Sequence, residues 1–175
     1  FTDEATYQKD NELFLTKGKS KAINEGVVIE ADNFKYSKLD NIMNANGNVK
    51  IDNKSENYLI YSNDATYLKN DQLFLTEGQS KAINKDIEIN AENFEYNKIN
   101  NTINAQGNVE IEDTTNNNFI YADEATYYKN SEKVISRGET KANINSKYFI
   151  TSKNVTYLHE KKIIGTSTKL SSLSL

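Results

Sequence analysis

Few residues in this chain could do acid–base, nucleophilic or metal chemistry. His159 is the single histidine, and the 175 residues include no cysteine. One imidazole is too few for a histidine-based metal site and offers no convincing Ser-His-Asp set. Adjacent acids such as Asp3–Glu4 and Asp123–Glu124 resemble calcium or glycosidase carboxylates, but neighbours on a strand point to opposite faces. We therefore expect no catalytic residue, no metal ligand and no cofactor, and we interpret the paired acids as bend residues.

Composition excludes other classes of function. The net charge is −4, with acids and bases interspersed, and no basic patch with interleaved aromatic residues suggests nucleic-acid binding. No run of apolar residues is long enough for a transmembrane helix. No signal peptide is visible, and the chain begins at Phe1 inside a repeat. We expect a mature or trimmed fragment.

The elements that would position any site are repeats. Residues 65–84 (ATYLKNDQLFLTEGQSKAIN) match residues 5–24 (ATYQKDNELFLTKGKSKAIN) at 14 of 20 positions. Residues 89–111 are similar to residues 29–51 at the same offset of 60, and a third copy begins at residue 125. Internal repeats of this kind indicate a stacked architecture and outrank other sequence signals.

The period divides again into six units of about 30 residues. Each unit is anchored on a tyrosine: Tyr7, Tyr36, Tyr67, Tyr96, Tyr127 and Tyr157. A glycine follows eleven positions later in the first five units: Gly18, Gly47, Gly78, Gly107 and Gly138. Thr168 takes that place in the sixth unit, so we expect a degenerate last repeat. We interpret residues 1–175 as a single domain.

Apolar residues alternate with period two throughout, which is typical of β-strands. The parity of the alternation changes at the acidic or amide pair before each anchor, as at Asp32–Asn33 and Glu92–Asn93. Such a change predicts a bend or bulge. No helical period competes, and there is no proline. The sequence predicts an all-β fold of about twelve strands, an open β-jellyroll with two facing sheets.

Residues seven positions from each anchor, with Phe34 and Phe94, should face the space between the sheets. The candidate lining residues are Phe14, Ile29, Phe34, Met43, Ile60, Phe74, Ile89, Phe94, Ile103, Ile120, Val134 and Ile150. Small residues such as Thr76, Ala105 and Ser80 lie beside them. These either pack closely at a bend or leave an apolar trough for a ligand, and the sequence leaves both open.

A basic residue occurs two positions after every anchor: Lys9, Lys38, Lys69, Lys98, Lys129 and His159. This column could meet anionic head groups along one rim of the stack. We favour a solvated row of surface charges, because charge rows mostly lie on the surface.

Segments such as ADNFKYSKLDNIMNANGNVKI (31–51) and AENFEYNKINNTINAQGNVEI (91–111) resemble the OstA-like repeats of lipopolysaccharide-transport proteins. The Gly-Asn-Val ending is the sharpest element, and the likeness extends from residue 1 to about 158. These repeats occur in LptA, in LptC and in the N-terminal periplasmic domain of the assembly protein LptD. The resemblance implies a periplasmic β-jellyroll whose interior shields lipid A acyl chains and whose members join edge to edge. An LptD domain, followed by an outer-membrane barrel in the same chain, is favoured over a free-standing LptA-like protein.

Two alternatives come from other classes of protein. A structural β-solenoid, such as a spacer or adhesin module, would have a filled, dry core. A carbohydrate-binding sandwich would need exposed aromatic platforms, for which Tyr58, Tyr61, Tyr121 and Tyr128 are candidates. The shape of the interior distinguishes these possibilities.

Overall fold

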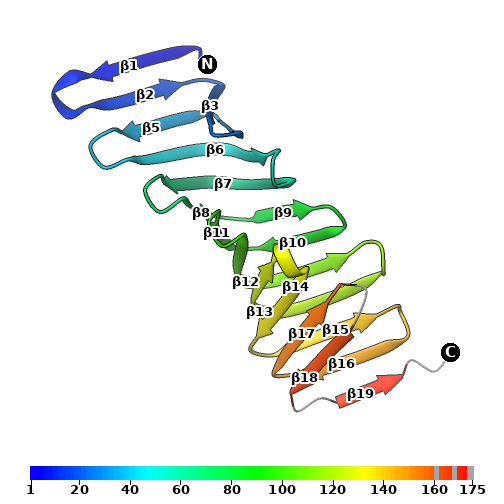
Figure 1. Cartoon of the computed structure of the whole chain (residues 1–175). Helices are drawn as coiled ribbons and strands as arrows, with labels where there is room; N and C mark the ends of the chain where they lie inside the picture. Colours follow the sequence, from blue (N-terminus) through cyan, green and yellow to red (C-terminus); the bar gives the residue numbers. More distant parts are fainter. Residues whose placement is uncertain (160–161, 167–168, 173–175) are drawn as a thin grey trace.

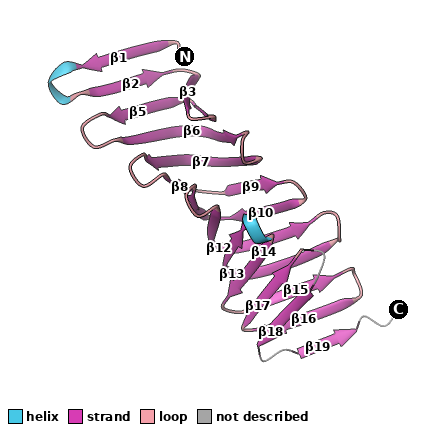
Figure 2. Cartoon of the chain, viewed as in Figure 1, coloured by secondary structure: helices cyan, strands magenta, loops and turns pink. Residues whose placement is uncertain are grey.

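The chain folds into an elongated stack of antiparallel β-strands. The structure is a computed structural model that describes residues 1–159, 162–166 and 169–172. The strands lie one above another from β1 near the N-terminus to β19 near the C-terminus (Figure 1). Apart from strands, Figure 2 shows two short helical turns, η1 (Lys9–Asn11) and η2 (Lys129–Ser131). The all-β prediction is confirmed.

The strands form two walls that face each other. Wall A consists of β1 (Glu4–Gln8), β2 (Leu13–Lys17), β5 (Asn33–Ser37), residues 42–46 of β6 (Ile42–Asn53), residues 64–68 of β7 (Tyr58–Leu68), β8 (Leu73–Glu77), β11 (Asn93–Asn97), residues 102–106 of β12 (Thr102–Asp113), residues 124–128 of β13 (Asn118–Tyr128), β14 (Lys133–Arg137), β17 (Asn154–Leu158) and β18 (Lys162–Thr166).

Wall B contains the other strands and the remaining halves of the long ones. It consists of β3 (Ser20–Asn24), β4 (Val27–Ala31), residues 49–53 of β6, residues 58–62 of β7, β9 (Ser80–Asn84), β10 (Ile87–Ala91), residues 109–113 of β12, residues 118–122 of β13, β15 (Thr140–Ile144), β16 (Tyr148–Ser152) and β19 (Lys169–Ser172).

The two walls meet at a row of bends. The long strands β6, β7, β12 and β13 pass through the bend, with a register shift between Asn46 and Val49 and again between Gln106 and Val109. Other strands stop there, so each of those repeats supplies separate strands to the two walls. The described residues therefore contain 19 strands where about twelve were expected.

Glycine is required at the bend. Gly107 has a φ of +79°, and a Cβ on it would lie 2.5 Å from Oε2 of Glu92. The left-handed conformation is costly for residues with a side chain, and the acid of the preceding strand occupies the remaining space. The first residue of the pair packs over the glycine in five repeats, as an acid in four (Asp3, Asp32, Glu92 and Asp123) and as Asn63 in the fifth, in agreement with its interpretation as a bend residue.

The last repeat continues both walls as β17, β18 and β19. Thr168, which takes the place of the repeated glycine, lies outside the described residues, as do residues 173–175. Within the described ranges, no helix is long and apolar enough to cross a membrane.

Candidate functional site: the space between the walls

The predicted lining residues lie between the two walls. Phe14 is 43% exposed and Met43 is partly buried. The other ten are buried and belong to one continuous apolar cluster: Ile29, Phe34, Ile60, Phe74, Ile89, Phe94, Ile103, Ile120, Val134 and Ile150. Their contact with a lipid stays a prediction.

Aromatic rings fill the middle of this interior. The rings of Tyr67 and Phe74 stack with centroids 4.2 Å apart, and Tyr96 lies 5.9 Å beyond Phe74. Tyr58, from wall B, packs 4.8 Å from Tyr96, which belongs to wall A. Because rings from both walls are in contact, the centre of the stack is a packed core in this conformation.

The small residues beside the lining serve the bend. Thr76 and Ser80 share a buried hydrogen bond of 2.6 Å across Gly78, and Oγ1 of Thr76 accepts one from the backbone N–H of Phe94. Ser136 and Thr140 form the same pair at 2.8 Å. Close packing at the bend therefore explains these small side chains, and their hydroxyl groups are satisfied there.

The side of the stack opposite the bends is its mouth, and a ladder of hydrogen bonds crosses it. Asn53 of wall B donates to the Tyr96 hydroxyl of wall A at 3.0 Å. One repeat further, the Tyr127 hydroxyl donates to Oδ1 of Asn84 at 3.1 Å. Asn24 and Tyr67 occupy the equivalent positions, and Asn24 partly offsets the rise in the pKa of Tyr67 that burial causes. Sequence reasoning missed this ladder, although an Asn recurs 17 positions after the anchors Tyr7, Tyr36 and Tyr67.

The next rung replaces Asn with a buried carboxylate. The hydroxyl of Tyr157 donates to Asp113, and Nδ1 of His159 lies 2.6 Å from Oδ2 of the same carboxylate. Burial opposes ionisation of Asp113, but hydrogen bonds from Asn116, Tyr157 and His159 outweigh it and lower the pKa of that carboxyl. His159 is therefore a partner of Asp113 in the mouth.

Two members of the basic column also cross the mouth. Lys129 pairs with Glu56 and lies 5.2 Å from the ring centroid of Tyr58, and Nζ of Lys98 lies 3.9 Å from Oε2 of Glu25. Their side chains are only 17% and 12% exposed, respectively. The prediction of a solvated row is wrong for these two residues, because the mouth is narrow enough for a lysine to reach the opposite wall.

The N-terminal end of the interior is uncovered. All five residues of β1 are exposed. Tyr7 is 47% exposed, and its ring stacks on Phe14 at 4.4 Å, with Tyr36 6.4 Å beyond. Ile23 of β3 is 61% exposed too, but it pairs with Val28 on the outer face of wall B. The aromatic column of the core thus continues as far as β1, where its rings are exposed.

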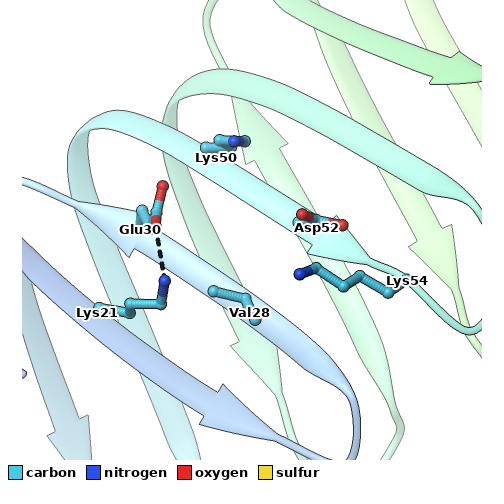
Figure 3. A pocket seen from close by; sticks show the side chains of 6 residues that line it. All are labelled: Lys21, Val28, Glu30, Lys50, Asp52 and Lys54. Atoms are coloured by element: carbon cyan, nitrogen blue, oxygen red, sulfur yellow. Dashed lines mark hydrogen bonds and ion pairs between the residues drawn. The ribbon is translucent and has the colours of Figure 1, made fainter.

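The outer face of wall B is polar. A hollow of about 220 Å³ lies on this face. Figure 3 shows the six side chains that line it: Lys21, Val28, Glu30, Lys50, Asp52 and Lys54. Lys21 donates to Glu30 at 3.0 Å, and bases and acids alternate around the rest. The lining of this hollow is mostly charged, unlike the apolar interior.

The candidate aromatic platform for carbohydrate is not formed. Tyr58 is 2% exposed and belongs to the core, whereas Tyr61 and Tyr121 are exposed on wall B. The ring of Tyr128 is covered by Lys133, whose Nζ lies 4.4 Å from its centroid. In the described part of the chain, no group of three or more His, Cys, Asp or Glu side chains could hold a metal ion.

The fold matches that of a known transport protein. Neither a protein-family model nor a curated protein matches the sequence. Among solved structures, the chain is similar to LptH, the LptA-homologous periplasmic component of the lipopolysaccharide transport device of Pseudomonas aeruginosa. The TM-score is 0.61 at 7% identity, over 71% of this chain and 99% of LptH. The chain therefore has the LptA-type β-jellyroll fold that the repeats predicted.

Proposed function

We propose that this chain is a lipopolysaccharide-transport module that works in the periplasm and is not an enzyme. The likeness to LptH supports this proposal, because it extends over nearly the whole of that protein. The interior supports it as well: the ten buried lining residues belong to one continuous apolar cluster, and lipid A acyl chains are the part of lipopolysaccharide that avoids water.

The observation that carries the proposal is the uncovered N-terminal end. Tyr7 and Phe14 leave the aromatic side of the interior exposed to whatever lies against β1. β1 is hydrogen-bonded to β2 on one side and presents its other edge. Such an edge gains main-chain hydrogen bonds from a further strand, so a homologous jellyroll could continue both walls and the path between them. We also propose that strand pairing of this kind attaches the chain to an outer-membrane LptD-type assembly.

One observation favours a structural spacer instead. The walls touch through packed rings, and side chains close the mouth. A module with a permanently dry core would look like this and would bind no lipid.

Binding of lipopolysaccharide by the purified chain separates the two functions. Labelled rough lipopolysaccharide should co-elute with the chain in gel filtration, whereas the same lipopolysaccharide stripped of its acyl chains should not. Absence of co-elution with both forms would favour the spacer. Equal co-elution would show that the sugar is recognised and would overturn the proposed role of the interior.

A further inference from the structure

Within the residues that the structure describes, the walls are covalently continuous only along the bends, so the mouth is held by side chains. Its innermost contacts are the hydrogen bonds between Tyr96 and Asn53 and between Tyr127 and Asn84. Asn53 and Asn84 are 1% and 3% exposed, so these amides are removed from water when the rungs form. Separation of the walls would break these bonds without breaking the β-ladder of either wall.

A second line of contacts lies outside the first. Lys129 of wall A reaches Glu56 of wall B, and Lys85 of wall B donates to Glu132 of wall A at 3.0 Å. One lysine belongs to each wall. Both pairs draw the walls together, because each joins a positive charge on one wall to a negative charge on the other. Partly exposed ion pairs of this kind are individually weak. They can exchange with water or with an anionic group when the walls move apart.

The interior requires such movement if it is to hold a ligand. Phe74, Tyr96 and Ile103 are at most 1% exposed, and rings of both walls are in contact with each other. A close-packed core resists the insertion of even a few methylene groups. An acyl chain can enter only where the walls separate.

We propose that the mouth is a gate, in which the tyrosine–asparagine rungs and the lysine–glutamate pairs hold the walls closed and part to admit acyl chains. This inference rests on the proposed lipid-binding function and adds its regulation. Where a phosphate or another anionic head group follows the acyl chain, the released Lys129 and Lys85 are placed at the rim to meet it. Of the two hydrogen-bonded rungs, Tyr96–Asn53 lies nearer the exposed N-terminal end, so the rungs can open in order from Tyr96 inward.

A reversible lock tests the gate. The chain has no cysteine, so Glu56→Cys with Lys129→Cys can be joined by a reducible bifunctional reagent as long as the side chains replaced. The matched control joins Lys81→Cys to Glu88→Cys, a lysine–glutamate pair at 2.5 Å between neighbouring strands of wall B. Binding of labelled rough lipopolysaccharide is measured before locking, after locking and after reduction.

The gate predicts at least a tenfold loss of lipopolysaccharide binding in the locked mouth variant, full recovery on reduction, and no loss in the locked control. Equal binding by the locked and reduced mouth variants would overturn the gate while leaving the proposed function intact. If the parent chain binds no lipopolysaccharide, both proposals fail together. Circular dichroism of the reduced and locked forms confirms that each variant is folded.

Discussion

Asn108 donates a hydrogen bond of 2.7 Å from its side-chain amide to Oε1 of Glu92, and the two side chains meet over Gly107 at the bend. The earlier repeat has the same arrangement, with Asn48 donating to Asp32 at 2.8 Å. The acid before the anchor tyrosine and the Gly-Asn sequence after it are therefore parts of one structural unit. That unit lies at the bend where the two walls meet.

The first prediction concerns the space over the glycine. Gly107→Ala should lower the free energy of unfolding by about 2–5 kcal/mol, because a positive φ costs about 1–2 kcal/mol and overpacking against Glu92 adds about 1–3 kcal/mol. Gly26→Ala is the matched control: its φ is +81°, but its nearest neighbour, Oγ of Ser55, would lie 3.9 Å from the new Cβ. Urea denaturation should show the smaller loss for Gly26→Ala, and equal losses would contradict a role for the contact.

The second prediction concerns the ladder across the mouth. Tyr96→Phe removes the hydroxyl that accepts from Asn53 and leaves a buried amide without that partner. Such a loss costs about 1–3 kcal/mol. Tyr61→Phe, on the outer face of wall B, should change stability by less than about 0.5 kcal/mol. Thermal unfolding of the two variants tests this, and similar melting temperatures would show that the rung adds nothing.

The third prediction is alkaline unfolding. Burial raises the pKa of Tyr96 to about 12, partly offset by the hydrogen bond from Asn53, and burial also raises the pKa of Tyr58, Tyr127 and Tyr157. The pKa values of these hydroxyls in the folded state exceed the unfolded value of about 10. Their contribution to the free energy of unfolding is therefore fully present below pH ~10 and is lost as pH rises toward ~12. Tyrosinate absorbance and circular dichroism should change together in the upper part of that range. Complete ionisation with an intact fold would contradict burial of these hydroxyls.

The fourth prediction concerns the free edge of β1. Proline disfavours strand pairing, so Thr6→Pro should weaken end-to-end association in sedimentation while the stack remains folded. Thr66, the equivalent residue 60 positions later, lies opposite both Leu75 and Asn44 in the interior of wall A. Thr66→Pro should instead destabilise the monomer. Unchanged association of the Thr6 variant would contradict a role for the β1 edge in end-to-end association.

Much of the fold could be predicted because the repeats report local geometry. Apolar residues alternate with a period of two, and the change of parity at Asp32 and Glu92 predicted the bends. The same alternation predicted that Ile60 and Phe74 face inward. The closed mouth was not predicted, because Tyr96 and Asn53 are 43 residues apart and meet only when two walls face each other. Periodicity indicates which face a side chain takes but does not measure the distance to the opposite wall.

The same limit explains the error about the basic column. Lys38 pairs with Glu12 on its own wall and is 59% exposed, as expected for a surface charge. Lys129 occupies the equivalent position and is 17% exposed, because Glu56 faces it across the mouth. The identity of the partner depends on the stagger between the walls, which the sequence pattern does not contain.

Site-specific photo-crosslinking in cells that make lipopolysaccharide tests the central claim most directly. Phe74 and Leu75 are adjacent on β8, and only Phe74 faces the buried interior. A benzophenone amino acid at position 74 should capture lipopolysaccharide, and the same residue at position 75 should capture little, because it points away from the space between the walls. Equal capture at the two positions, or capture at position 75 alone, would contradict transport of acyl chains through this interior.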